Sequence, residues 1–429
     1  MKTVLIISPY FPPSNAADMQ RVRMSLEYFK DFDWCPEVVT VAEEFSDAVK
    51  DELLVQSIPK DIVVHTVKAL SKKWTSKIGL GSIALRSLIF YRKEVDRLLK
   101  NKKYHLIYFS TTQFPVCILG AYWKKKWNIP YVIDMQDPWH SDYYKDKPKY
   151  ERPPKYWFSY NLNKMLEPIA MREVGGLISV SGAYIDTLKS RYHVLNSKPS
   201  AVITFGAYDR DLTVVVKNSD KLDSFIKRKD DIYNLAYVGR GGKDMHKALT
   251  IWFNAFKKGI ETFPDIFNKF IINFIGTSYA PKGQGIPSIL PLARELGLQD
   301  FVKEHTDRIP FYEGLKTLAT ADALLVPGSD DSSYTASKLY PYIQAKKPLI
   351  GIFHPMSSAI TILEDCKAGE VLTLDVSEGE AFNVISQFII KVFNGSYVND
   401  TNWSNFEKYT AKEMTRNQVG LFNEVLGQA

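Results

Sequence analysis

The chain has 429 residues, of which 45% are hydrophobic and 24% charged, and its formal net charge is +7. This composition is that of a globular protein, and the length exceeds what one core usually fills, so we expect two domains. The three cysteines are too far apart for a zinc site or a disulfide framework, which argues against a disulfide-rich secreted protein and favours the cytoplasm.

The N-terminus carries one lysine and a short apolar run that ends at Ser8-Pro9. This run is too short for a signal peptide or a membrane span, and it predicts a buried first strand. Strand patterns then alternate with helical patterns, which is typical of βαβ units and parallel sheets. The expected strands are residues 3–8, 38–41, 62–67, 106–110, 131–134, 177–181, 201–204, 233–238, 270–275, 301–304, 323–326, 349–353 and 370–374.

Thirteen strands are too many for one ordinary doubly wound sheet, but they suit two sheets of six or seven. The seventh strand is followed by a polar, charged stretch at Lys217–Asp231 that has no strand pattern. We therefore expect one α/β domain at residues 1–205 and a second at 206–400. The remaining residues, 401–429, contain a helical pattern at Trp403–Leu426.

Positive charge is concentrated between Lys68 and Lys103, where eleven lysines or arginines accompany two acidic residues and many apolar ones. A basic amphipathic segment of this kind can lie on an anionic membrane surface. A solvated helix with one face on the core explains the pattern equally well. No nucleic-acid-binding motif accompanies the charge, so we expect no nucleic-acid partner.

Two loops at the ends of expected strands combine residues that suit a phosphorylated ligand. The first, within Tyr237–Leu249, has glycines and the cations Arg240, Lys243 and Lys247, and the second, within Pro327–Phe353, is rich in serine and aspartate. Ligands of open α/β sheets bind outside the carboxyl ends of the strands. We therefore expect the loops to hold a diphosphate at one end and a sugar at the other. Neither contains the GxGxxG pattern of a nicotinamide dinucleotide site, which argues against a dehydrogenase.

Five segments, taken in order, resemble GT-B fold nucleotide-sugar glycosyltransferases of the kind grouped in glycosyltransferase family 4. They are SPYFPPSNAADMQRV, SVSGAYIDTL, VITFGAYD, YVGRGGKDMHKAL and SKLYPYIQAKKPLI. The resemblance covers essentially the whole chain. It implies two Rossmann-like domains that face each other across a cleft, with the acceptor on the N-terminal domain and the nucleotide sugar mainly on the C-terminal one. It also implies that the last helix crosses back onto the N-terminal domain, and that no metal or other cofactor is needed.

The resemblance implies that Arg240 and Lys247 grip the diphosphate and act in catalysis, because fixed cations stabilise the charge on a leaving phosphate. The gap between them is one residue longer than usual, so His246 or Lys243 could replace Lys247. Other donor-binding residues are expected where these loops and the neighbouring ones match the family. They are Gly239, Gly241, Lys243, Gly276, Thr277, Arg308, Ile309, Asp330, Asp331, Ser332, Ser337 and Lys338.

The second loop departs from the family pattern. Family members usually have two glutamates there. In this chain the first would fall near Ser333 and the second at Pro341, so both glutamates are absent where the family has them. Asp330 or Asp331 could replace the first by hydrogen bonding to sugar hydroxyls, whereas a solvated turn is the simpler interpretation. Nothing obvious replaces the second.

The loop after residues 131–134 is expected to bind the acceptor. An acceptor hydroxyl needs a group to take its proton, and Asp137 is the first candidate and His140 the second. Trp139 would contact the acceptor, although the same Asp-Pro-Trp sequence suits a rigid turn with a packed ring. In the first loop, Asn15 and Arg21 match acceptor-side positions, and Arg21 could instead hold the loop to its own helix.

The sequence therefore predicts a glycosyltransferase that moves a sugar from a nucleotide-diphosphate sugar to a glycan or lipid-linked glycan acceptor in the synthesis of surface polysaccharide. The resemblance implies that the anomeric configuration is retained. We expect it in the cytoplasm or at the inner face of the membrane. A non-catalytic GT-B protein that binds glycan or a partner is one alternative, and a sugar-nucleotide epimerase is another.

Overall fold

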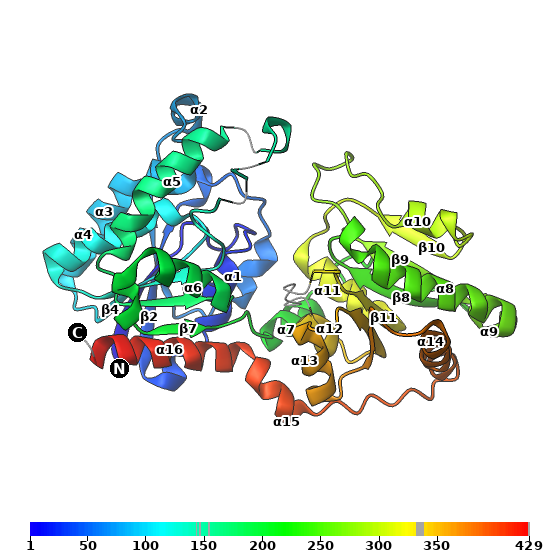
Figure 1. The fold of residues 1–429 in the computed structure, drawn as a ribbon. Coiled ribbons are helices and arrows are strands. Elements are labelled where there is room, and N and C mark those ends of the chain that lie inside the picture. The colour runs from blue at the N-terminus through cyan, green and yellow to red at the C-terminus, as the bar shows by residue number, and fades with distance from the viewer. Residues whose placement is uncertain (143, 146, 153–154, 332–338, 428–429) are drawn as a thin grey trace. The chain divides into compact units, whose positions relative to one another are not determined.

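The computed structural model describes residues 1–142, 144–145, 147–152, 155–331 and 339–427. The chain forms two compact units (Figure 1), one of Met1–Gly206 with Tyr409–Ala429 and one of Ala207–Lys408. Each contains one parallel sheet with flanking helices, so the expected α/β class is confirmed. All thirteen expected strands are present, seven in the first sheet and six in the second.

The first unit has the strand order β3-β2-β1-β4-β5-β6-β7. Every residue of β4 and β5 is buried, and since successive side chains point to opposite faces, helices must cover both sides of the sheet. This explains the apolar runs that identified the strands in the sequence. The strands are β1 (Lys2–Ile7), β2 (Trp34–Val41), β3 (Val63–Val67), β4 (Leu106–Ser110), β5 (Tyr131–Met135), β6 (Gly176–Ser179) and β7 (Ser200–Val202).

The helices of the first unit alternate with its strands, and the last one comes from the end of the chain. That helix, α16, packs beside α1, and its Phe422 ring lies edge-on to Trp34 and Tyr108. The helices are α1 (Met19–Ser25), α2 (Lys72–Thr75), α3 (Ile83–Asn101), α4 (Ile118–Trp127), α5 (Tyr156–Met171), α6 (Gly182–Arg191) and α16 (Ala411–Gly427).

The helix expected at Trp403–Leu426 is interrupted. It consists of α15 (Trp403–Phe406) and the short η9 (Glu407–Tyr409), followed by α16. The interruption coincides with a close approach of two backbones, because a Cβ atom on Gly206 would lie 2.6 Å from backbone atoms of Thr410 and Ala411. Only the part from Tyr409 onward belongs to the first unit.

The second unit has the order β10-β9-β8-β11-β12-β13. Its strands are β8 (Tyr233–Val238), β9 (Phe270–Ile275), β10 (Val302–His305), β11 (Ala323–Pro327), β12 (Leu349–Phe353) and β13 (Glu370–Thr373). Its helices are α7 (Asp209–Lys217), α8 (His246–Thr262), α9 (Pro264–Phe267), α10 (Leu290–Glu295), α11 (Phe311–Thr320), α12 (Leu339–Gln344), α13 (Ser358–Cys366), α14 (Glu378–Phe393) and α15.

Both sheets are doubly wound, and each has one topological switch point. It lies between β1 and β4 in the first unit and between β8 and β11 in the second. Chain connections leave these two strands in opposite directions, which opens a crevice at their carboxyl ends where ligands of such sheets bind. The switch points therefore locate a candidate site in each unit.

Candidate functional site

The two loops singled out in the sequence meet at the switch point of the second unit. One follows β8 and carries Arg240, and the other follows β11 and includes Asp330. The backbone N–H of Asp330 donates to the backbone carbonyl of Asp244 over 2.9 Å. Strand order thus brings together two segments that are far apart in the sequence.

Arg240 is held by a carboxylate four residues further on. Its Nη1 and Nη2 donate to Oδ1 and Oδ2 of Asp244 over 3.0 and 2.6 Å, and its side chain is 31% exposed. This pairing lowers the pKa of Asp244, and the hydroxyl of Ser329 in the other loop adds to the effect. Asp244 therefore orients the guanidinium and contacts both loops, which makes it a site residue that the sequence did not single out.

Two tyrosine hydroxyls fix the backbone that leads into the Arg240 loop. The hydroxyl of Tyr342 accepts from the N–H of Val238 over 2.7 Å and donates to its carbonyl over 2.9 Å. The hydroxyl of Tyr237 donates to the carbonyl of Arg240 over 2.9 Å. Since Tyr342 is buried and engaged in this way, it braces the loop instead of offering its phenol to a ligand.

Lys243 and Lys247 are exposed near the start of α8. Lys247 lies in the first turn of α8, the helix that follows the carboxyl end of β8. His246 cannot take its place, because the imidazole Nε2 donates to the carbonyl of Ser288 over 2.9 Å. Arg240 and Lys247 are thus presented at the same edge of the sheet.

A side chain at Gly241 and a side chain at Gly242 would meet different neighbours. A Cβ on Gly241 would lie 2.8 Å from Ser288 Oγ and 3.0 Å from Thr277 Cβ, which are parts of the packed neighbouring loop. A Cβ on Gly242 would lie 2.3 Å from Asp244 Oδ1 and 2.6 Å from Arg240 Nη1. The absence of a side chain at Gly242 therefore leaves room for the Arg240–Asp244 pair.

We expect Gly242→Ala to displace the Arg240–Asp244 pair and to weaken nucleoside diphosphate binding several-fold, because a small misplacement of a binding group is costly. Thermal unfolding should change little, since the atoms in the way are the ends of flexible side chains. Gly379→Ala, at a position in α14 where a Cβ would meet nothing within 4 Å, is the matched control. The affinity for the nucleoside diphosphate is measured by calorimetry. If Gly242→Ala binds it as tightly as the parent chain does, the Arg240–Asp244 pair does not contribute to ligand binding.

The loops after β9 and β10 lie beside the Arg240 loop. The carbonyl of Thr277 accepts from the N–H of Gly241 over 2.9 Å, whereas its buried hydroxyl donates to Glu304 over 2.7 Å. The side chain of Thr277 is therefore committed to packing, which corrects its predicted contact with the donor. Gly276, in the left-handed region at φ 75°, and the residues Arg308 and Ile309 before α11 remain predictions.

Asp330 and Asp331 are exposed in the second loop, and the N–H of Asp331 is bound to the hydroxyl of Ser329. Gly239 precedes Arg240, and its N–H donates to the carbonyl of Ile275. The predicted donor residues Ser332, Ser337 and Lys338 lie outside the described residues.

At the switch point of the first unit, Asp18 joins the loops after β1 and β4. Its Oδ2 accepts from the Thr111 hydroxyl over 2.7 Å and from the Thr112 N–H over 3.0 Å. Burial nevertheless raises the pKa of Asp18. This carboxylate was not predicted from the sequence, because its contacts depend on β4 lying beside β1.

Asp137 follows β5 and is exposed. Partial desolvation and the nearby carboxylate of Asp18 raise its pKa above the ordinary value for aspartate. Asn15, in the loop after β1, is half-buried and held by its backbone N–H, which donates to the Val49 carbonyl. The acceptor roles of Asp137 and Asn15 remain predictions.

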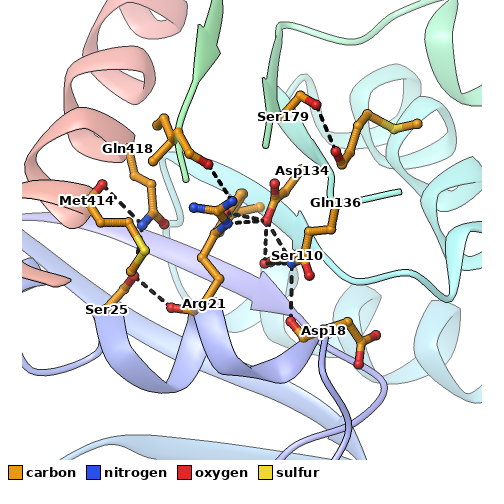
Figure 2. A network of polar contacts seen from close by, with 12 residues as sticks. Asp18, Arg21, Ser25, Ser110, Asp134, Gln136, Ser179, Met414 and Gln418 are labelled. Carbon is orange, nitrogen blue, oxygen red and sulfur yellow. Dashed lines mark hydrogen bonds and ion pairs between the residues drawn. The ribbon is translucent and has the colours of Figure 1, made fainter. Parts of the chain in front are cut away.

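The predicted acceptor contact of Arg21 is corrected, because this residue is completely buried. Figure 2 shows its polar contacts. Its Nε lies 2.7 Å from Oδ2 of Asp134, also completely buried, and its Nη2 donates to the carbonyl of Ile203 over 2.7 Å. Ser110 and Gln136 donate to the same Asp134 oxygen over 2.9 and 2.8 Å. Arg21 thus holds α1 to the centre of the sheet, a role that differs from both of those considered from the sequence, since its partners lie on β5 and after β7 and not in the loop before α1.

Trp139 and His140 are also corrected. The indole of Trp139 is buried against Phe114 and donates to Asn163, so its ring is not available for the predicted contact with an acceptor. His140 is only 9% exposed and packs against Tyr160, and burial, with a contribution from Arg191, lowers its pKa. Its burial against Tyr160 makes the ring part of the packing of the unit, which argues against the predicted role as the acceptor of a substrate proton.

Neither a metal cluster nor a membrane-spanning helix is found in the described part of the chain. Its histidine, cysteine and carboxylate side chains form no group of three or more that could hold a metal ion. No described helix combines the length and hydrophobicity needed to cross a bilayer.

No family model matches the sequence, and no curated protein is significantly similar to it. Solved structures match it over its whole length. A sucrose-phosphate synthase from Thermosynechococcus elongatus has a TM-score of 0.57 at 12% identity, with 100% of both chains covered. HepE from Anabaena, solved with UDP and glucose, has a TM-score of 0.56 at 14% identity, again with 100% of both chains covered. A glycosyltransferase from Rickettsia africae has a TM-score of 0.52 at 12% identity, with 100% of this chain and 99% of that chain covered.

The chain has the GT-B fold. The expected fold is thereby confirmed, and at these identities the likeness establishes the fold alone. In this GT-B chain, both units keep the doubly wound order, so the residues at their two switch points are the candidates for binding and chemistry.

Proposed function

We propose that the chain is a glycosyltransferase that moves a sugar from a nucleotide-diphosphate sugar to a glycan or lipid-linked acceptor. The observation that carries this proposal is the presentation of Arg240 and Lys247 at the carboxyl edge of the second sheet, beside its switch point. The HepE structures with UDP and with UDP-glucose support a donor of this class, because they share the fold. In this proposal the second unit binds the donor and the first unit binds the acceptor.

The chemistry follows from the charge that develops when the donor is cleaved. The bond between the anomeric carbon and the phosphate oxygen breaks, and its electron pair stays on the leaving diphosphate. Arg240 and Lys247 would stabilise this charge more strongly in the transition state than in the ground state. Side-chain cations would thus stabilise the leaving diphosphate, and we propose that no metal or other cofactor is required. Activity that persists in the presence of EDTA would support this.

The resemblance to family 4 supports two finer proposals. One is retention of the anomeric configuration, which NMR of the first product would test. The other is a role in surface polysaccharide synthesis at the inner face of the membrane, where lipid-linked acceptors are present.

Calorimetric titration with a panel of nucleoside diphosphates tests the central proposal. We expect one of them to bind the parent chain and to bind Arg240→Ala much more weakly. Pro341, in place of the usual second glutamate, supports the rival of a non-catalytic binding protein. Absence of binding by every nucleoside diphosphate would favour that rival, and conversion of donor without acceptor would favour an epimerase.

Asp137 provides a prediction about pH. A carboxylate accepts a proton only when ionised, so turnover should fall as the pH drops through its pKa. Because the pKa of Asp137 is raised, the acid limb of the kcat/KM profile should lie above the ordinary aspartate value. Asp137→Asn should lower turnover by about a hundredfold or more and remove that limb. A limb that persists in this variant would assign it to another group.

A further inference from the structure

Two tryptophans of the first unit are almost fully exposed. Trp74 in α2 is 73% exposed and Trp157 in α5 is 76% exposed. Large apolar side chains that gather on a surface commonly mark an interaction site, because their hydration is unfavourable. Trp403 of the second unit is less exposed, at 40%, and the Lys346 ammonium lies over its ring.

The segments that carry Trp74 and Trp157 lie side by side. The Nζ of Lys155 donates to the carbonyl of Ser76 over 2.9 Å. A Cβ on Gly79 would lie 2.7 Å from the ring of Phe158, so the turn after α2 packs on the first turn of α5. The same arrangement is visible in Figure 1, where α2 adjoins one end of α5. The two segments that carry the exposed rings are therefore neighbours in space, which the sequence alone did not show.

Helix α5 extends the apolar surface away from Trp157. Met165 is 64% exposed and Ile169 is 40% exposed, and they follow Trp157 at intervals of eight and twelve residues. At 3.6 residues per turn, Met165 lies about 80° and Ile169 about 120° around the helix from Trp157, so the exposed apolar side chains spread over a broad face of α5. Asn161 occupies the intervening position and donates to the carbonyl of Trp157, within the same turn.

Lysines surround this apolar surface. Lys73, Lys77, Lys155 and Lys164 are all exposed. The ammonium group of Lys77 lies 5.0 Å from the centre of the Trp74 ring. Neither Lys73 nor Lys77 has a carboxylate partner among the described residues. Tryptophan with lysine is the combination that suits the interfacial region of a bilayer, where rings enter the headgroup layer and ammonium groups meet anionic lipids.

We propose that the surface formed by Trp74, Trp157, Met165 and the adjoining lysines docks the first unit onto an anionic phospholipid bilayer. The proposal identifies the residues that would contact the membrane in the proposed function. It depends on that function only for the reason why the chain would bind a membrane. The positive charge of the lysines favours an anionic lipid surface over a zwitterionic one. Salt screens this attraction, whereas insertion of the exposed rings does not depend on charge, so the contact should persist at moderate salt.

Sedimentation with lipid vesicles tests the proposal without any nucleotide sugar. The full chain should bind vesicles of phosphatidylcholine mixed with phosphatidylglycerol, and bind phosphatidylcholine alone far more weakly. Trp74→Ala/Trp157→Ala should lower the partition coefficient about tenfold because apolar insertion is lost. Lys73→Glu/Lys77→Glu should lower it by at least about tenfold through lost attraction to the lipid charge.

Trp403→Ala is the matched control, since it removes an exposed tryptophan from the other unit and should leave vesicle binding unchanged. Quenching of tryptophan fluorescence by brominated lipid should also decrease in the Trp74/Trp157 variant and persist in Trp403→Ala. Absence of vesicle binding by the parent chain, or parental binding by the double tryptophan variant, would overturn the proposal. Nucleoside diphosphate titration of the same variants reports separately on the proposed transferase function.

Discussion

Arg240→Ala is expected to lower turnover on the order of a hundredfold, the usual effect of removing one transition-state donor. The guanidinium lies at the carboxyl edge of the second sheet, beside the switch point, and Asp244 fixes its orientation. Its removal should also weaken nucleoside diphosphate binding, because the ground state shares part of the interaction. Turnover measured with the donor identified by calorimetry checks the result.

Two further variants sharpen this test. Arg240→Lys keeps the charge without the planar fork that pairs with Asp244, so we expect it to restore only part of the activity. Arg294→Ala removes an exposed arginine of α10 and should leave turnover unchanged. Parental turnover in Arg240→Ala, with thermal unfolding also unchanged, would remove Arg240 from the mechanism.

Arg21→Met is expected to destabilise the first unit by about 3–5 kcal/mol, because it leaves the Asp134 carboxylate buried without its cation. Both side chains are completely inaccessible to solvent, and the carbonyl of Ile203 loses a donor as well. Hydrogen exchange of the β1 and β4 amides is the suitable measurement, since it reports opening of this unit without requiring two-state unfolding of the whole chain.

A double-mutant cycle distinguishes the ion pair from lost packing. Arg21→Met/Asp134→Asn should be less destabilised than the sum of the single variants, since neither charge then remains buried alone. Lys30→Met breaks a pair with Asp61 in which both side chains are about half exposed, and it should have no measurable effect. Strict additivity in the cycle would show that the pair does not stabilise the unit.

The sequence determined the elements of this protein. Alternating apolar runs and helical patterns predicted thirteen strands, all of which are present, because burial on both faces of a parallel sheet requires continuous apolar residues. The same patterns placed Arg240 directly after β8 and Lys247 at the start of α8, where the order of elements alone puts them at a carboxyl edge.

Only the tertiary structure decided which polar residues are available to a ligand. An arginine or tryptophan in a loop gives no sign in the sequence of whether it faces solvent or the core. Arg21 is buried against Asp134 of β5, and Trp139 is buried against Phe114. Asp244 reaches Ser329 and Asp18 reaches Thr111, each in the loop after a neighbouring strand. These contacts join residues distant in the chain, and strand order, which the local sequence pattern does not encode, brings them together.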